Sequence, residues 1–157
     1  MAKNIVATSQ PLAAQAGLRM LLEGGNAVDV AIATAICLTV VEPTGNGIGG
    51  DAFCILWDGD KIHGLNASGC SPKALTPDRV RESQSRPVNG CDSVTVPGCV
   101  SAWVALSERF GNLPFERLFE PAIHYARHGF LVAPITARSW DNQSRRFAGF
   151  SEFARGF

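Results

Sequence analysis

The stretch Glu23–Trp57, with the sequence EGGNAVDVAIATAICLTVVEPTGNGIGGDAFCILW, decides the fold of this chain. The pattern predicts that a helix ends at Gly24-Gly25 and that Asn26 begins a new one, because its side-chain oxygen can accept backbone N–H groups of the first turn. From Val28 to Val41 nearly every residue is apolar, which is typical of a helix buried on most of its surface. The run is shorter than the roughly 20 apolar residues that cross a bilayer, so we expect a central helix of a globular domain.

A glycine-dense loop follows this helix after Pro43 and leads into the apolar segment Ala52–Trp57, which we interpret as a buried strand. Asp58-Gly59 predicts a turn, and a second strand over residues 61–65 completes a hairpin. The loop matches G-x-G-x-x-G from Gly45 to Gly50, but a dinucleotide site needs a strand before the loop and a helix after it. The order here is helix, loop, strand. We therefore expect the glycines to permit close backbone approach rather than to bind a nucleotide.

Weaker signals predict the elements on either side of this stretch. Glycine, proline and capping residues separate segments of helical or alternating hydrophobic spacing. The expected elements are a strand at Ile5–Thr8, a helix from Pro11 with Ser9 as its N-cap, a polar surface segment over residues 66–92 with a short helix near Thr76-Pro77-Asp78, a strand at Val94–Val96, an amphipathic helix from Val100 to Phe110, a helix from Pro114 to His128 bent or split at Pro121, and a helix from Pro134 to about Asn142.

Composition points to one globular domain that binds neither nucleic acid nor a membrane. The 157 residues carry 14 basic and 14 acidic side chains, so no excess of charge favours a polyanionic partner. The five cysteines are odd in number and scattered, which favours reduced thiols over a disulfide framework. The first residues lack the apolar region of a signal peptide. We expect a cytoplasmic protein, and the phenylalanines of residues 147–157 suggest a chain that stops before its fold does.

No segment of the sequence supplies a complete catalytic set. His124 and His128 stand four residues apart, yet no third ligand accompanies them, so we interpret them as solvated or capping side chains and expect no metal. Ser68-Gly69-Cys70 offers a hydroxyl and a thiol without the surroundings of a nucleophile elbow. The tryptophans, Trp57, Trp103 and Trp140, are expected in the core. From these residues alone we predict no catalytic group and no cofactor.

Several runs of sequence, in order along nearly the whole chain, resemble the γ-glutamyltransferase family. They combine small residues, prolines and single polar residues in fixed spacings. The runs are ATSQPLA at residues 7–13, EGGNAVD at 23–29, VEPxGxGxGGDAF at 41–53, VPGCV at 96–100 and PAIHYARHGF at 121–130.

The resemblance implies an α/β fold, the four-layer αββα sandwich of N-terminal nucleophile (Ntn) hydrolases, of which residues 1–157 would be the N-terminal part of the large subunit. Such precursors cut themselves, and the new N-terminal Thr of the small subunit attacks the γ-glutamyl bond of glutathione or a related amide, with its own α-amino group as base. Water or an amino acid then accepts the acyl group. The small subunit is outside these 157 residues, so the resemblance implies a chain that is inactive alone.

The family's carboxylate-binding Arg, four residues before the Pro of an Arg-x-x-x-Pro stretch, should lie just after the hairpin. Counting back from Pro72 gives Ser68, and no Arg occurs between Asp58 and Asp78. A serine cannot replace the bidentate grip of a guanidinium on a carboxylate. Ser68 and the nearby Asn66 are therefore the candidate substrate-binding residues, for a γ-glutamyl amide or another amide of the kind that cephalosporin acylase-like members take.

Two other interpretations differ in class from a γ-glutamyltransferase-like enzyme. The chain could be half of a split acylase, with its small subunit supplied separately. It could instead be a non-enzymatic module that binds a small ligand or a protein, for which a cooperative unfolding transition of the isolated chain would be the sign. We expect the isolated chain to aggregate or to pack loosely instead, because its apolar faces lack partners.

Overall fold

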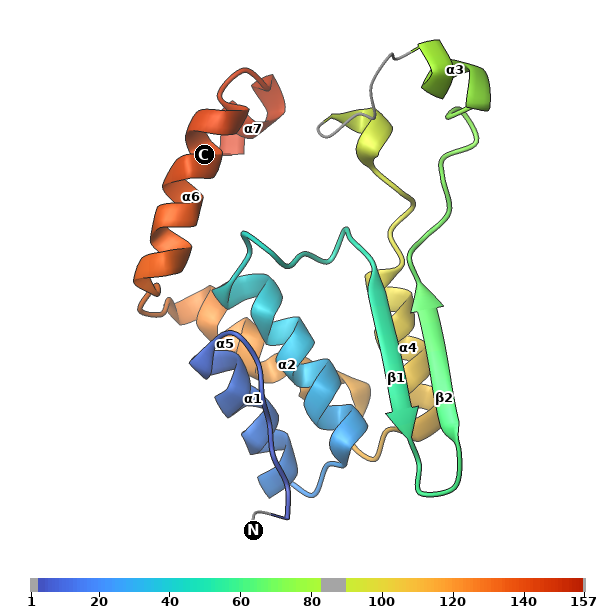
Figure 1. Ribbon diagram of the computed structural model, residues 1–157. Helices are drawn as coiled ribbons and strands as arrows, with labels where there is room; N and C mark the ends of the chain where they lie inside the picture. Colours follow the sequence, from blue (N-terminus) through green and yellow to red (C-terminus); the bar gives the residue numbers. More distant parts are fainter. Residues whose placement is uncertain (1–2, 83–89, 157) are drawn as a thin grey trace. The chain divides into compact units, whose positions relative to one another are not determined.

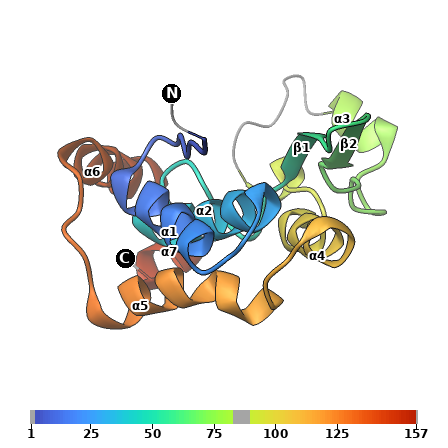
Figure 2. The same cartoon turned by 90° about the horizontal axis from the view of Figure 1, so that it is seen from below.

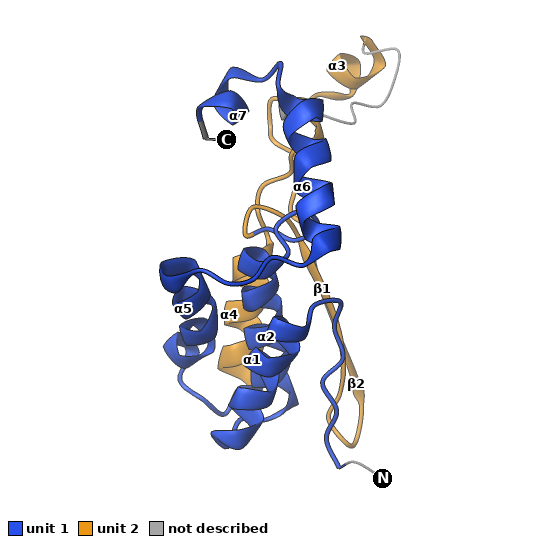
Figure 3. Ribbon diagram, turned by 90° about the vertical axis from the view of Figure 1, so that its left-hand side faces the viewer, with its two compact units in different colours: residues 1–47, 110–157 blue, residues 48–109 orange. Residues whose placement is uncertain are grey.

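The computed structural model describes residues 3–82 and 90–156. The chain divides into two compact units, one of residues 1–47 with 110–157 and one of residues 48–109 (Figure 3). The first unit is helical and the second contains the hairpin (Figure 1). The thiol of Cys91 and the side chain of Phe157, both part of the sequence-based expectations, lie outside what is described.

The helical unit is built around the predicted central helix. Helix α2, Ala27–Val41, has nine buried residues among its 15, which confirms the predicted burial. It contacts both α1, Pro11–Leu22, and α5, Glu120–His128, and Figure 2 shows the three side by side. The core cluster contains small and medium side chains that let the helices approach closely. It consists of Ala13, Ala16, Cys37 and Val41, with Leu12, Leu38, Tyr125 and Phe130 packed against it.

The start of α1 corrects two predictions. Gln10, not Ser9, is the N-cap: its Oε1 accepts the backbone N–H of Leu12 at 2.5 Å and that of Ala13 at 3.2 Å. The Ser9 hydroxyl instead donates to the Glu42 carboxylate beyond the end of α2. Pro11 is the first helical residue, as predicted, since its missing N–H would have no helical partner there.

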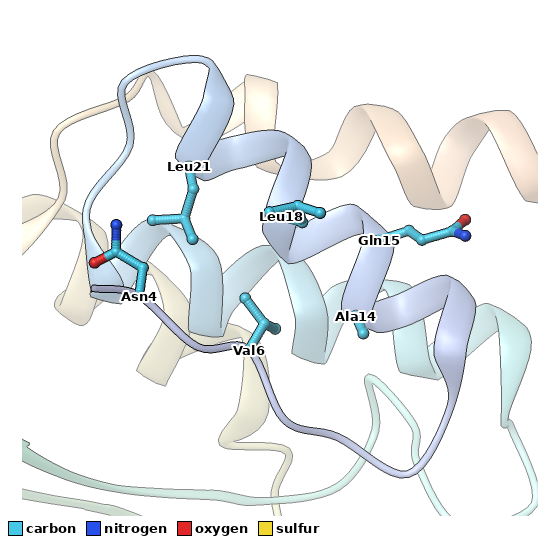
Figure 4. A pocket seen from close by; sticks show the side chains of 6 residues that line it. All are labelled: Asn4, Val6, Ala14, Gln15, Leu18 and Leu21. Atoms are coloured by element: carbon cyan, nitrogen blue, oxygen red, sulfur yellow. The ribbon is translucent and has the colours of Figure 1, made fainter. Parts of the chain in front are cut away.

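Residues 5–8 are not a strand, contrary to the prediction. A strand needs a neighbour to take its backbone hydrogen bonds, and the described residues offer this segment none. The segment runs beside α1 instead, where Figure 4 shows Asn4 and Val6 across a shallow hollow from Leu18 and Leu21. Val6 thus packs there without backbone pairing, whereas Ile5 is 79% exposed.

The motif around Asn26 ties the two parts of the helical unit together. Asn26 Oδ1 accepts the N–H groups of Val28 at 2.8 Å and Asp29 at 3.2 Å, and Asp29 Oδ2 accepts the N–H of Asn26 at 2.9 Å. This reciprocal pair is a capping box, so the predicted cap is confirmed. Asp29 is fully buried and also accepts backbone N–H groups from Asn112 and Leu113.

The remaining helices of this unit follow the predictions with shifted ends. The predicted split at Pro121 is confirmed: a 3₁₀ helix η2, Phe115–Phe119, precedes α5. Helix α6, Pro134–Phe147, begins where predicted and runs beyond Asn142. A short helix, α7, Ser151–Gly156, follows, and the ring of Phe147 lies 5.8 Å from that of Phe150. In the described ranges, no helix combines the length and hydropathy required to span a membrane.

The second unit contains the predicted hairpin. Strands β1, Ala52–Trp57, and β2, Ile62–Ala67, are antiparallel, with Trp57 opposite Ile62 next to the turn and Ala52 opposite Ala67 at the other end. Helix α3, Pro77–Glu82, the 3₁₀ turn η1, Cys91–Ser93, and helix α4, Cys99–Phe110, complete the unit. The short helix and the amphipathic helix were both predicted. Residues 94–96 are not a strand, because a single backbone bond, Val96 N–H to Cys70 O, does not continue into a ladder.

The prediction that β1 is a buried strand is wrong for one of its two faces. Phe53, Ile55 and Trp57 alternate along β1 with exposed fractions of 65%, 85% and 60%, and Ile62 on β2 is 71% exposed. The opposite face is half-buried. We call these four residues the exposed apolar face. Trp57 therefore lies outside the core, whereas Trp103 of α4 is buried as predicted.

Candidate functional site

The two candidate residues lie where the hairpin ends. Asn66 is exposed and near the end of β2, and Ser68 is half-buried and the first residue after that strand. The Asn66 side chain turns back along the chain, because its Oδ1 accepts the Ser68 backbone N–H at 3.0 Å. The structure thus brings the two together, with Asn66 fixing the direction in which the chain leaves the strand.

A second segment holds residues 66–70, which we call the Ser68 loop. Thr95 Oγ1 donates to the Ser68 carbonyl oxygen at 3.2 Å, and the Val96 N–H donates to the Cys70 carbonyl at 2.9 Å. The backbone of Ser68 is therefore held on both sides, at its N–H by Asn66 and at its carbonyl by Thr95. The loop is positioned by hydrogen bonds of the main chain, and the residue 68 side chain takes no part in them.

Two glycines make this contact possible. Gly69 has φ +76, and a Cβ built on it would lie 1.9 Å from the Val96 carbonyl oxygen. A Cβ on Gly98 would lie 2.3 Å from the Ala67 carbonyl oxygen. Any side chain at either position would push the two backbones apart, since real Cβ atoms never come so close to oxygen. The sequence analysis did not foresee that Thr95 and Gly69 take part in this contact. A glycine on each side of it, Gly69 and Gly98, was the signal in the sequence that two backbones come close here.

The glycine-dense loop ends against the same segment. The Gly50 carbonyl accepts the N–H groups of both Gly98, at 3.0 Å, and Cys99, at 3.1 Å. Cys99 is buried at the start of α4, and burial, with the nearby Asp51 charge as a second cause, raises the pKa of its thiol. Burial also raises the pKa of the Cys37 thiol, to about 11. Both thiols are protonated at neutral pH and are poor nucleophiles.

Ser68 and Asn66 place two neutral hydrogen-bonding side chains at the end of β2. A serine hydroxyl can donate one hydrogen bond and accept others, without charge. Among the residues that the structure describes, no three His, Cys, Asp or Glu side chains are grouped as metal ligands. His128 Nδ1 lies 3.0 Å from the His124 carbonyl oxygen, as expected of a histidine that satisfies a helix end.

The comparison with known protein families shows to which family this chain belongs. The sequence profile described as Gamma-glutamyltranspeptidase matches residues 13–157. The chain belongs to the γ-glutamyltranspeptidase family. The "Glutathione hydrolase-like YwrD proenzyme" of Bacillus subtilis (strain 168) is 40% identical over 139 residues, which are 87% of this chain and 26% of that protein.

Solved structures of γ-glutamyltranspeptidase-like proteins share its fold. The cephalosporin acylase from Bacillus halodurans is 47% identical, with a TM-score of 0.85 over 95% of this chain and 30% of that one. The γ-glutamyltranspeptidase from Pseudomonas nitroreducens, complexed with L-DON, is 31% identical, with a TM-score of 0.89 over 99% and 48%. The chain thus has part of the α/β Ntn-hydrolase fold that the family resemblance implied, and it spans about a quarter of the length of the curated relatives it matches.

Proposed function

We propose that residues 1–157 form the first part of the large subunit of a γ-glutamyltransferase-like Ntn amidohydrolase. The observation that carries this proposal is the family match over residues 13–157, together with the 26% of the related proenzyme that the match covers. In the proposed enzyme, the N-terminal Thr of a separate small subunit attacks the amide carbonyl and its α-amino group accepts the proton. Water or an amino acid then releases the acyl group. The 157-residue chain alone has no activity in this proposal.

The proposed role of the Ser68 loop is to hold the end of the acyl group that lies away from the scissile bond. Asn66 and Thr95 fix the loop, so the side chain at position 68 decides what is recognised there. With an arginine, a free γ-glutamyl group would be held by its α-carboxylate through two parallel hydrogen bonds. With Ser68, one neutral hydrogen bond replaces that interaction, which favours an acyl group lacking the glutamate α-carboxylate.

The solved structures give specific support to an acylase among the alternatives. Identity to the cephalosporin acylase is 47%, against 31% to the γ-glutamyltranspeptidase, although both folds match closely. We therefore propose an amide other than a free γ-glutamyl compound as the preferred substrate, with glutathione-type γ-glutamyl amides as weaker ones. The DNA sequence downstream of the Phe157 codon would tell whether the small subunit is encoded in the same reading frame or by a separate gene.

Two assays test the proposal. The 157-residue chain, mixed with a chromogenic γ-glutamyl amide, is expected to show no turnover above buffer. Turnover that survives repurification and is abolished by a point substitution in this chain would contradict the proposal. In the enzyme completed by its small subunit, Ser68→Arg is expected to raise kcat/KM for the γ-glutamyl amide relative to an acyl amide without the α-carboxylate. Ser71→Arg, in the same segment, is the matched control and should leave that ratio unchanged.

We also propose a cytoplasmic location. Cys37 and Cys99 are buried free thiols, and buried cysteines that form no disulfide are typical of proteins kept under reducing conditions. Fractionation of the source cells, with an antibody against this chain, tests the proposal, and recovery of the chain outside the cytoplasm would contradict it.

A further inference from the structure

His63 has both ring nitrogens engaged within the second unit. It lies on β2 opposite Leu56, on the half-buried face of the hairpin, and its side chain is only 12% exposed. Nε2 lies 2.5 Å from Asp58 Oδ2 in the hairpin turn. Nδ1 lies 3.2 Å from Nη2 of Arg109 near the end of α4. The ring therefore links the hairpin turn to the last turn of a helix 46 residues further along the chain.

The chemistry of the two neighbours fixes where the proton of a neutral ring must be. The Asp58 carboxylate also accepts the N–H groups of Asp60 and Lys61, each at 2.9 Å. The Lys61 N–H above all, then His63 and the Asp60 N–H, hold the pKa of Asp58 well below its usual range. An ionised carboxylate only accepts hydrogen bonds, and a guanidinium only donates them. A neutral His63 must therefore carry its proton on Nε2 and present the lone pair of Nδ1 to Arg109.

We propose that His63 is a pH-operated latch that holds the C-terminal turn of α4 to the hairpin when neutral and releases it when protonated. A proton from solvent binds Nδ1 and converts the acceptor of the Arg109 hydrogen bond into a donor. Two positive charges then face each other, while the hydrogen bond to the ionised Asp58 becomes an ion pair and is strengthened. Two charged groups of opposite sign thus face the ring, Asp58 from the turn and Arg109 from α4, and protonation strengthens one contact while it breaks the other.

The test uses the enzyme completed by its small subunit, with this chain uniformly labelled with ¹⁵N, studied by NMR from about pH 8 to about pH 5, the interval in which imidazoles change charge. At the upper pH, His63 is expected as the Nε2–H tautomer. Between the two ends of the titration, the hydrogen-exchange protection factors of the last turn of α4 are expected to fall by about threefold or more, as the loss of one hydrogen bond predicts.

Two variants separate the latch from general effects of pH. Arg109→Met keeps much of the aliphatic side chain and removes the donor, so protection of the α4 end should no longer depend on pH in this interval. His124→Gln removes another histidine, on α5, and should leave the response intact. An Nδ1–H tautomer would overturn the proposal. So would unchanged protection of the last turn of α4 in the wild-type protein.

Discussion

The buried carboxylate of Asp29 accepts the backbone N–H of Asn112 with both of its oxygens, at 3.1 and 3.0 Å. The two residues are 83 positions apart. Asp29 also accepts the N–H groups of Asn26 and Leu113, so one side chain both caps α2 and anchors the segment that follows α4. Nearby, Gly25 leaves no room for a side chain, since a Cβ there would lie 2.8 Å from the backbone carbonyl oxygen of Met20 and 2.8 Å from Leu113 Cδ1.

Replacing Asp29 should therefore destabilise the helical unit severely. Asp29→Ala leaves buried N–H groups without an acceptor, and we expect a loss of about 3 kcal/mol in the free energy of unfolding. Asp29→Asn keeps one acceptor oxygen and should cost less. Urea unfolding followed by far-UV circular dichroism measures both. Gln15→Ala, at an exposed position of α1, is the control and should change stability by less than about 0.5 kcal/mol. A similar effect of Asp29→Ala and the control would contradict the anchoring role.

Gly17 marks the closest approach of α1 to α2. A Cβ on Gly17 would lie 2.4 Å from Thr34 Oγ1, a buried hydroxyl without a hydrogen-bond partner among the described residues. Gly17→Ala gains about 1 kcal/mol in helix propensity, but overpacking of this kind costs about 1–3 kcal/mol, so we expect a net loss of stability. Thr34→Ala alone removes an unsatisfied polar atom and should have a small effect.

A double-mutant cycle checks this contact. In the Thr34→Ala background, Gly17→Ala should be less destabilising than in the wild type, because the hydroxyl that it strikes is gone. Strictly additive effects of the two substitutions would show that the helices adjust elsewhere and that this contact does not limit their approach.

Four charged side chains join α1 to the helices after α4, and their contribution should depend on pH. Glu23 lies 2.7 Å from both Arg19 and Arg117, and Glu120 pairs with the same two arginines. Arg19 first and then Arg117 lower the pKa of Glu23 below its ordinary value of 4.5. A carboxyl whose pKa is lowered by folding stabilises the folded chain at pH values above its pKa in the unfolded state. This contribution is lost as the pH falls through its pKa in the folded state.

Glu23→Gln should thus reduce stability at neutral pH, by at most about 1 kcal/mol because the pairs are partly exposed and screened by solvent. The difference between wild type and variant should shrink below about pH 4.5 and in high salt. Urea unfolding at several pH values tests this. Glu116→Gln, an exposed acid in η2, is the control. A difference that grows on acidification would contradict the assigned sign.

The exposed apolar face should make the isolated chain aggregate. Ile55 is 85% exposed in the middle of β1, and a charge there interrupts an apolar surface without touching the half-buried face. Ile55→Lys should increase the monomeric fraction in size-exclusion chromatography with light scattering, with a change in stability of less than about 0.5 kcal/mol. Leu56→Lys, on the other face, should instead unfold the hairpin. Equal aggregation of wild type and Ile55→Lys would assign the association to another surface.

Local chemistry made much of the helical unit predictable. The Asn26 cap, the apolar run to Val41 and the proline at position 121 each act within a few residues, and the structure confirms all three. The errors arose where the outcome depends on distant partners. Gln10 caps α1, while the Ser9 hydroxyl donates to Glu42, 33 residues away. Residues 5–8 and 94–96 have strand composition but no neighbouring strand to complete a ladder.

The place of Ser68 in the fold was predictable from the sequence, and the contacts that hold its loop were not. Counting from Pro72 placed Ser68 just after the hairpin, and β2 does end at Ala67. Thr95 lies 27 residues further along the chain, and only the folded structure shows that its hydroxyl donates to the Ser68 carbonyl. Likewise, the continuous apolar run of β1 does not tell whether both of its faces are covered, so the exposure of Phe53 and Ile55 could not be foreseen from composition.

The close contact of Gly69 and Gly98 with opposing carbonyl groups has a consequence for which positions of this segment can vary. Hydrogen bonds to its backbone groups and the two glycines hold the loop in place, so the side chain of residue 68 is not needed to hold it. A mutation at that codon can exchange a cationic side chain for a neutral one without refolding the surroundings. A single substitution at position 68 can therefore change the chemistry of the loop, whereas the two glycines admit no such freedom.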